Sequence, residues 1–508
     1  MLKTFRQAPF LRTVLFFIAG ITVQYYWNIS NCAGYLTVFA LSIMIMSFLP
    51  RIKQCYTQRD LFGYGFLLLS FTCAVYLTDE SWKKSEWNVA GIHTYLVRVI
   101  DEPSVKTKYS ILKVEIISSD SGIIKETLNK KAVIYLTKDS LSEKIIHGDC
   151  LYIRASLKKP QTSPDSDFNY PLYLRKQSYS AVAFVSNRSW QMETIDVPLN
   201  QWLYFKSLEI RKKLYNRLRV ILPDQQSFSV AAALMFGYRN ELDSNLRQHF
   251  SNIGAGHILA VSGLHFNLLF GFVYFLLSFI GTGKKKNIIK QLILIPLTWG
   301  FAFIAGLSPS VIRAACMLSL WGIGNAFFHK SFSLNTLAAI AFFMLLYNPL
   351  YLFNIGFQLS FMAVLSILII NPYIIGLYSS ENRIITYFWE LICVSFSAQA
   401  GVLPLSMYYF HQFPLMFLPT NMLLVPLAGI IMTVVPLSLF VQLVSGNQEW
   451  LFFPLRLLML LFIKITKTLS DIPGGTISDI NPTGLDTILI YVGLIVIIYM
   501  LVRKRTAS

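Results

Sequence analysis

Long apolar runs alternate with short polar stretches over most of this chain. A membrane-spanning helix needs about 20 apolar residues, and about twelve runs approach that length. They cover residues 13–27, 33–49, 61–78, 256–280, 291–306, 308–328, 332–347, 350–371, 384–410, 413–442, 450–470 and 485–502. The pattern predicts a polytopic α-helical membrane protein with about 12 spans.

One long polar segment, residues 79–200, interrupts the apolar runs. It contains five short runs rich in β-branched and aromatic residues, separated by Gly, Asp, Ser, Pro and Lys. The runs are residues 92–100, 109–118, 132–137, 150–156 and 180–186. Five short strands of this kind favour a small β-barrel such as an OB-fold. We therefore expect an inserted OB-like β domain.

OB-folds commonly bind single-stranded nucleic acid through a basic groove with stacking aromatic side chains. This segment is nearly neutral, with 17 Lys or Arg against 15 Asp or Glu. A DNA-binding face and an ordinary solvated surface both stay open. A DNA-binding face would lie near Lys106, Lys108, Lys113, Lys130 and Lys131.

An amphipathic basic helix is predicted over residues 202–222. Leu203, Ile210, Leu214, Leu218 and Ile221 recur at helical spacing, and basic residues occupy the remaining arc. Those basic residues are Lys206, Arg211, Lys212, Lys213, Arg217 and Arg219. Such a helix can lie in the lipid interface or guide phosphates toward a pore. The next apolar run, 227–237, is too short to span and is predicted to be re-entrant.

The composition excludes an ordinary soluble protein, since 54% of the residues are hydrophobic and only 14% are charged. The net charge of +18 invites a nucleic-acid interpretation, but most of it lies in four clusters beside predicted spans. With alternating spans all four fall on one side, which by the positive-inside rule is the cytoplasm. Both termini are then cytoplasmic and residues 79–200 extracytoplasmic. The clusters are Lys3, Arg6 and Arg12; Arg51, Lys53 and Arg59; Lys284, Lys285, Lys286 and Lys290; and Arg503, Lys504 and Arg505.

The run GHILAVSGLH at residues 256–265 opens a predicted span with unusual polarity. His257, Ser262 and His265 stand where a lipid-facing helix would carry leucines. Polar side chains are costly at membrane depth unless they face protein or water. Their presence indicates a lined cavity.

The same run resembles the HLLAxSGLH signature of ComEC-type competence proteins. Further motifs follow in the family's order: ALMFG at 233–237, GLSPSVIRAA at 306–315, FNIGFQLSF at 353–361 and a QxxxxP region from 399. FNY at 168–170, followed by YL, resembles the family's FDYxxYL at the end of its external domain. The resemblance covers roughly residues 80–470 through several ordered motifs, which is more specific than any one of them.

The resemblance implies an inner-membrane channel that takes single-stranded DNA into bacteria. Many family members continue into a metallo-β-lactamase-like domain proposed to degrade the strand that is not imported. Here the sequence stops at Ser508 and contains no HxHxDH motif. We therefore expect a short form, in which degradation falls to a separate nuclease or does not occur.

Four polar residues within the later apolar runs are candidates for the DNA pathway, together with His257, Ser262 and His265. Arg313 is the strongest, because it can contact phosphate and follows the small residues Gly306, Ser308 and Ser310. Its alternative role is a side chain that snorkels to the external interface. The other three, Gln358, Gln399 and Asn421, can line the same passage or brace neighbouring helices.

An enzymatic interpretation is open but weaker. Ser262 and His265 are three positions apart, hence on neighbouring faces of a helix, yet no acidic residue nearby could orient the histidine. The six cysteines and seven histidines form no CxxC or HxH pair, so no metal site or cofactor is predicted. No Walker A motif occurs, so any ATP-driven pulling must come from a partner.

The sequence thus predicts a non-enzymatic channel for single-stranded DNA, multi-pass in the bacterial inner membrane. Its expected partners are lipids, an extracytoplasmic DNA receptor, a cytoplasmic ATP-driven translocase and a nuclease. The alternatives are a transporter of another anionic solute and an intramembrane serine hydrolase. The expected parts are N-terminal transmembrane helices at 1–78, the OB-like domain at 79–200, basic and re-entrant helices at 201–240, a competence-type channel domain at 241–475, and a last helix with a cytoplasmic tail at 476–508.

Overall fold

A computed structural model describes most of the chain. The described residues are 8–48, 57–86, 91–106, 108–120, 125–162, 169–239, 241–259, 263–281, 283–327, 334–446 and 448–507. They divide into two compact units, Met1–Glu209 with Ala341–Asn354 and Ile210–Ile340 with Ile355–Ser508. Two helices, α7 (Leu199–Ile221) and α13 (Leu334–Tyr347), pass from one unit to the other.

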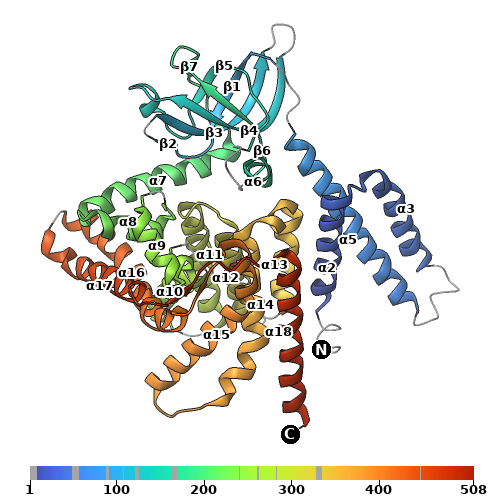
Figure 1. The fold of residues 1–508 in the computed structure, drawn as a ribbon, viewed down its shortest axis with the longest axis vertical. Coiled ribbons are helices and arrows are strands. Elements are labelled where there is room, and N and C mark those ends of the chain that lie inside the picture. The colour runs from blue at the N-terminus through green and yellow to red at the C-terminus, as the bar shows by residue number, and fades with distance from the viewer. Residues whose placement is uncertain are drawn as a thin grey trace. The chain divides into compact units, whose positions relative to one another are not determined.

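The first unit begins with three apolar helices, α2 (Pro9–Trp27), α3 (Ser30–Met46) and α5 (Thr57–Lys84). Both α2 and α3 pack against α5, as the blue ribbons of Figure 1 show. Gly20 makes the α2–α5 contact close, because a Cβ atom there would collide with the carbonyl oxygen of Phe71. Small residues at membrane-helix contacts allow this approach.

A mixed β-sheet follows in the same unit. All five predicted strands are present, and two short ones, β2 and β7, were not predicted. The strands are β1 (His93–Val99), β2 (Ser104–Val105), β3 (Tyr109–Asp120), β4 (Lys125–Thr137), β5 (Cys150–Ala155), β6 (Tyr179–Val185) and β7 (Trp190–Glu193), with a short 3₁₀ helix at Ser142–Lys144 and the helix α6 (Tyr170–Lys176) between them.

The sheet order is β6-β4-β3-β1-β5-β7, with β2 paired to β3. All strand pairs are antiparallel except β4 with β6, which is parallel. Just after β5, Lys158 meets Val182 of β6 in an isolated bridge. Within the described residues these pairings do not close a barrel, so the predicted OB-like barrel is not confirmed.

Side chains alternate between the two faces of this sheet. Leu112, Val114 and Ile134 are fully buried in its main core. The residues between them point to the opposite face, where Leu174 of α6 packs with Val133. The period of two therefore produces one closed core face and a second face that α6 only partly covers.

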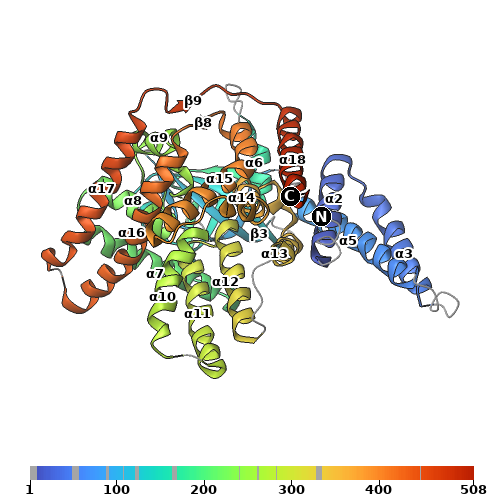
Figure 2. The ribbon, with the colours of Figure 1, turned by 90° about the horizontal axis from the view of Figure 1, so that it is seen from below.

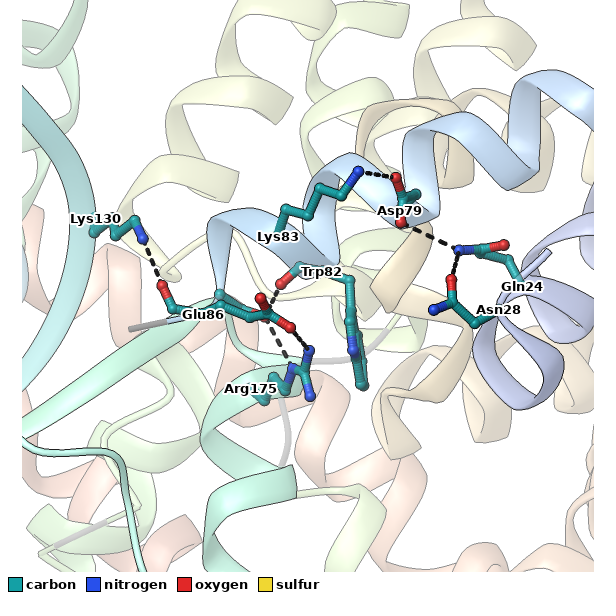
Figure 3. Close-up of polar contacts among 9 residues, drawn as sticks. Gln24, Asn28, Asp79, Trp82, Lys83, Glu86, Lys130 and Arg175 are labelled. Atoms are coloured by element: carbon teal, nitrogen blue, oxygen red, sulfur yellow. Dashed lines mark hydrogen bonds and ion pairs between the residues drawn. The ribbon is translucent and has the colours of Figure 1, made fainter. Parts of the chain in front are cut away.

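Polar contacts within the first unit join the end of α5 to α6 and to β4 (Figure 3). The Arg175 guanidinium lies over the Trp82 ring, 3.5 Å from Cζ to the ring centroid, and it donates hydrogen bonds to Ser85 and Glu86 at 3.1 and 3.2 Å. Lys130 Nζ donates to the Glu86 carbonyl oxygen at 2.5 Å. Burial lowers the pKa of Arg175 from its ordinary value, although Glu86 opposes this. The residue stays charged because arginine titrates far above neutral pH.

The second unit is helical apart from two short strands. After α7 come α8 (Gln225–Phe236), α9 (Ser244–Asn252), the 3₁₀ helix η2 (Ala255–His257), α10 (Gly263–Ser278), α11 (Lys284–Ile304), α12 (Pro309–Phe327), α14 (Ile355–Ile374), α15 (Arg383–Phe410), α16 (Phe417–Ser445), α17 (Phe453–Ser470) and α18 (Gly484–Ala507). The strands β8 (Phe413–Pro414) and β9 (Thr476–Ile477) pair with each other, and further 3₁₀ turns lie at Ile375–Leu377 and Glu449–Phe452. The turn η3 (Pro349–Phe353) follows α13 in the first unit.

Helix α8 lies at the centre of the second unit, in contact with α16 and α17. Ten of its twelve residues are buried, and the C-terminal half of α7 packs on the same core through Leu218 and Ile221. The predicted amphipathic helix is therefore present, and Leu214, Leu218 and Ile221 of its apolar side pack on this core. Leu203 and Ile210, nearer its start, are exposed. The predicted short segment at 227–237 is a buried helix.

Each of the twelve predicted spans coincides with a helix. Among the described residues, six helices are long and apolar enough to cross a membrane: Pro9–Trp27, Asp60–Lys84, Lys285–Ile304, Ile355–Leu377, Arg383–Phe410 and Phe417–Ser445. Five more are apolar but shorter, namely α3, α10, α12, α13 and α18. Helix α17 is amphipathic, since Arg456, Lys464 and Lys467 accompany its buried face. The chain is a helix-rich membrane protein, and the count of twelve stays a prediction.

Candidate functional site

Arg313 lies buried among the helices of the second unit, with 6% of its surface exposed. A tight turn places it there, because Gly306 and Leu307 both have positive φ and α12 then begins at Pro309. Arg313 Nε donates to Ser360 Oγ on α14 at 2.5 Å, and its Cζ lies 5.8 Å from the Phe361 ring centroid. The structure thus holds the charge inward among the helices. The snorkelling alternative would instead require the side chain to reach the lipid interface.

In the part of the chain that the structure describes, no carboxylate accompanies this buried cation. The chain contains no Asp or Glu between Asp243 and Glu381, and within the described residues Arg313 forms no ion pair. A buried, unpaired charge is strongly disfavoured. An anion beside the guanidinium would therefore stabilise this buried charge.

The N-terminal end of α10 lies beside the same guanidinium. A Cβ atom on Gly263, the first residue of α10, would be 3.2 Å from Arg313 Nη2. Helix N-termini carry a partial positive charge and free N–H groups. Two positive features therefore meet at one point, and both favour a negatively charged group there.

The run at residues 256–265 contains three predicted site residues, and two of them lie in described elements. His265 is fully buried in helix α10, two residues after Gly263. His257 is exposed on η2, and its Nδ1 donates to the Gly254 carbonyl oxygen at 2.8 Å. Ser262 lies outside the described residues, so its place relative to either histidine stays a prediction.

The predicted amide residues lie on three different helices. Gln358 of α14 accepts a hydrogen bond from Tyr409 Oη of α15 at 2.7 Å, which favours the bracing role. Gln399 and Asn421 are half-buried on α15 and α16. In the described part of the chain the Asn421 Oδ1 atom is buried without a hydrogen-bond partner. Only Gln358 shares a helix with the residues that contact Arg313.

The six basic residues of α7 differ in their neighbours and in their exposure to solvent. Lys206 pairs with Glu209 at 2.7 Å, Arg211 lies over the Tyr238 ring with Cζ 4.0 Å from its centroid, and Arg219 lies 5.3 Å from the Phe228 ring centroid. The side chains of Lys212 and Arg217 are half-buried, and that of Lys213 is exposed.

Arg211 also links α7 to the turn that leads to Arg313. A Cβ atom on Gly306 would lie 3.3 Å from Arg211 Nη1. The basic helix therefore lies next to the α11–α12 turn at Gly306, seven positions before the buried arginine.

Comparison with known proteins identifies the family. Residues 234–504 match the family model Competence, described as competence protein, and this match covers more than half of the chain. The chain belongs to the competence protein family.

Several relatives of this competence protein are recognisable by sequence. It is 29% identical to ComE operon protein 3 of Bacillus subtilis over 311 residues, which are 60% of this chain and 38% of the relative. It is 26% identical to Recombination protein 2 of Haemophilus influenzae over 228 residues, 42% of this chain and 28% of the relative. An uncharacterized protein of Aquifex aeolicus is 29% identical over 242 residues, 47% of this chain and 52% of the relative. The competence protein thus spans about half or less of the length of these relatives, and no solved structure matches it.

The β domain of this competence protein carries a second candidate site. On the face that α6 partly covers, Tyr135 and Phe184 are register partners and stack with ring centroids 4.8 Å apart. Tyr109 meets Phe184 at 6.0 Å. Phe184 is 69% exposed and Tyr109 38%. Three adjoining rings on a strand surface form a platform on which flat, aromatic groups can stack.

Exposed lysines flank these rings, and a neutral tyrosine hydroxyl lies near them. Lys158 pairs with Val182, two residues before Phe184, so both side chains share its face. Lys106 and Lys108 precede Tyr109 and are exposed. Burial, and then a 3.0 Å hydrogen bond with Tyr135 Oη, raise the pKa of the nearby Tyr170 hydroxyl above its ordinary value. The sequence predicted the lysines Lys106 and Lys108 but missed the aromatic rings, whose common face only the strand register reveals.

Proposed function

We propose that this competence protein is a non-enzymatic channel that passes single-stranded DNA across the bacterial inner membrane into the cytoplasm during DNA uptake. The observation that carries the proposal is the buried Arg313, which has no carboxylate partner among the described residues. Single-stranded DNA bears one negative charge per nucleotide and must exchange its counterions for protein cations along the path. A passing phosphate would supply the missing anion beside Gly263 and Ser360.

The proposed topology has twelve spans and both termini in the cytoplasm. Twelve helices lie at the twelve apolar runs, and the basic clusters fall on one side if these helices alternate. The β domain is then extracytoplasmic, where it meets incoming DNA. In this orientation Arg313, in the first turns of α12, lies nearer the external face.

We interpret the β domain as an OB-type fold that receives the strand. The sheet order β6-β4-β3-β1-β5, with β4 and β6 parallel, suits a five-stranded, partly open Greek-key barrel. OB-folds bind oligonucleotides on the face of their second and third strands, which here are β3 and β4. Tyr109 and Tyr135 lie on these strands, and bases can stack on such rings without sequence preference.

In this proposal helix α7 leads the DNA strand from the β domain to the helical channel. Lys212, Lys213 and Arg217 would attract phosphates, and Arg211 would deliver the strand to the turn before Arg313. His257, His265, Gln358, Gln399 and Asn421 would line or brace the remaining path, and the same role is proposed for Ser262. Energy would come from a cytoplasmic ATP-driven translocase, delivery from an extracytoplasmic receptor and degradation from a separate nuclease.

A transporter of another anionic solute is the second candidate, since a buried arginine also suits a small anion. The β domain separates the two proposals. Three adjoining aromatic rings can stack with nucleic-acid bases, whereas a small inorganic anion has no ring with which to stack. DNA passage is therefore the stronger proposal.

The test is uptake of fluorescently labelled DNA by cells lacking this protein, complemented with defined variants. We expect uptake to be restored by the parent protein and by Arg383→Ala, which removes an exposed arginine at the start of α15. Arg313→Ala should fail to restore it at equal membrane abundance. Unchanged DNA uptake in the cells that lack the protein would refute the proposal, and loss of a small anion's uptake instead would support the second candidate.

A further inference from the structure

A second buried cation lies deeper in the same group of helices. Lys290, on α11, is only 3% exposed, although it belongs to a basic cluster that the charge pattern assigns to the cytoplasmic side. Its Nζ lies 5.7 Å from the Tyr274 ring centroid on α10. Figure 2 shows α10, α11 and α12 side by side at one edge of the helical unit, and the three helices are in mutual contact.

Gln291, the next residue, adds a second buried donor. It is 5% exposed, and its carboxamide lies against Gly322 of α12, where a Cβ atom would collide with Oε1. Among the described residues its Nε2 atom is buried and has no hydrogen-bond partner. A buried donor without an acceptor is costly, so this amide points to a ligand with acceptor oxygens.

Among the described residues, no carboxylate serves as a counter-charge to Lys290. Helices α10, α11, α12, α14 and α16 contain no Asp or Glu, and within the described residues Lys290 forms no ion pair. The Tyr274 ring stabilises a cation only weakly compared with a carboxylate. Lys290 and Gln291 are consecutive residues of α11. A buried ammonium without a carboxylate and a buried amide N–H without an acceptor, both among the described residues, match the chemistry of a phosphodiester.

The position of Lys290 relative to Arg313 fits successive contacts with one strand. From the α11–α12 turn, Lys290 lies 14 residues back along α11, and Arg313 lies 4 residues beyond the start of α12. At 1.5 Å per residue the two cations differ in depth by about 15 Å. The apolar cluster containing Phe266, Phe270 and Phe301 lies on the same three helices.

We propose that Lys290 and Gln291 form a second phosphate-binding station on the DNA path, on the cytoplasmic side of Arg313. This inference rests on the proposed function, because the phosphate is that of the translocated strand. Arg313 binds the backbone first, and Lys290 binds it again after it has passed the apolar cluster. Two separated cations hold a strand in register without a single deep binding site from which it could not leave.

The first test compares Lys290→Gln with Lys285→Gln. Both remove one positive charge from the same cluster and the same helix, but Lys285 is exposed. We expect Lys290→Gln to lower DNA uptake about tenfold, as for loss of a charged hydrogen bond, while Lys285→Gln leaves it unchanged and Lys290→Arg retains part of it. Equal loss in both glutamine variants would overturn the proposal, because it would indicate an effect on topology.

The second test uses the parent protein and does not depend on the folding of a variant. A single strand with one abasic aldehyde and a streptavidin block at its trailing end is stalled during uptake, and cyanoborohydride then reduces any imine formed with a lysine. Mass spectrometry should find an adduct on Lys290. Absence of this adduct, with normal uptake by Lys290→Gln, would overturn the station while leaving the channel proposal intact.

An anionic lipid headgroup presents the same phosphate chemistry. If it were the ligand, Lys290→Gln would release bound lipid in native mass spectrometry without slowing uptake, and the station would not belong to the DNA path. If Arg313→Ala and the deletion also left uptake unchanged, the proposed function itself would be wrong. The two failures are therefore distinguishable.

Discussion

Arg313 on α12 donates a hydrogen bond from Nε to Oγ of Ser360 on α14 at 2.5 Å. This contact fixes the direction of the guanidinium plane while its Nη atoms face the start of α10, since Nη2 is the atom closest to a Cβ built on Gly263. The charge is therefore positioned by one helix and presented to another. Ser360 lies in the GFQLSF motif, so the motif supplies the group that orients the arginine.

Removal of the Arg313 charge should reduce DNA uptake by roughly ten- to a hundredfold, because a charge-assisted phosphate contact is lost. Arg313→Lys should retain part of the activity, since it keeps the charge but loses the planar fork. Ser360→Ala should give a smaller loss, because the cation remains but is no longer oriented. Uptake assays at matched membrane abundance measure all three. Normal uptake by Arg313→Ala would remove this residue from the pathway.

The proposed topology can be tested by cysteine accessibility. In a variant without the six native cysteines, a cysteine at position 285 should react with a membrane-impermeant maleimide only after the cytoplasmic side is opened. A cysteine at position 130 should react in intact spheroplasts, because the β domain is external. Labelling of both positions from the same side would contradict the architecture and the direction of transport.

Some of these features could be predicted from the sequence because they follow from local composition. The twelve apolar runs coincide with helices, since a long apolar run in a membrane must satisfy its backbone hydrogen bonds internally. The five strand runs coincide with strands, since β-branched and aromatic residues suit a pleated sheet. The short β2 and β7 strands contain too few residues to form such a run. The parallel pairing of β4 with β6 joins strands that β5 and α6 separate in the chain, and no local pattern reports it.

The candidate site was less predictable, because a sequence does not show which side of a helix faces protein. Lys285 and Lys290 belong to one basic cluster, yet five positions turn a helix by about 140° beyond a full turn. Lys285 is consequently exposed, whereas Lys290 is buried. In the same way, Arg313 could be recognised by its isolation among apolar residues. Its partner Ser360, 47 positions away, could not be predicted from the sequence.

The α7 residues should influence DNA capture to different degrees. Neutralising Lys212 and Arg217 should reduce the slope of log affinity against log salt by about 1.4 for a single strand, because two phosphate contacts no longer release counterions. Neutralising Lys206 and Arg219 removes the same charge, but these side chains already contact Glu209 and Phe228. The measurement is binding of an oligothymidine to the full chain in nanodiscs at several salt concentrations. A slope in the Lys212 and Arg217 double variant that is unchanged from the parent protein would confine α7 to an anchoring role.

Ser262 separates the channel from the hydrolase alternative. Ser262→Ala should leave DNA uptake unchanged if this serine packs or lines the path, because a methyl group fills nearly the same space. A serine-reactive fluorophosphonate should also fail to label the parent protein. Loss of uptake in the variant together with labelling of Ser262 would favour catalysis over a channel.

The aromatic platform of the β domain should contribute to strand binding through base stacking. Phe184 is its most exposed ring, so Phe184→Ala should weaken oligothymidine binding by about 1–3 kcal/mol, the usual value of one stacked base. The salt dependence should stay the same, because no phosphate contact is removed. Tyr152→Ala is the matched control, since Tyr152 is an exposed aromatic residue on β5 of the same sheet. If both variants lose affinity equally, or Phe184→Ala loses none, the platform does not bind bases. If Phe184→Ala instead weakens attachment to DNA-free lipid vesicles, the rings belong to the membrane interface.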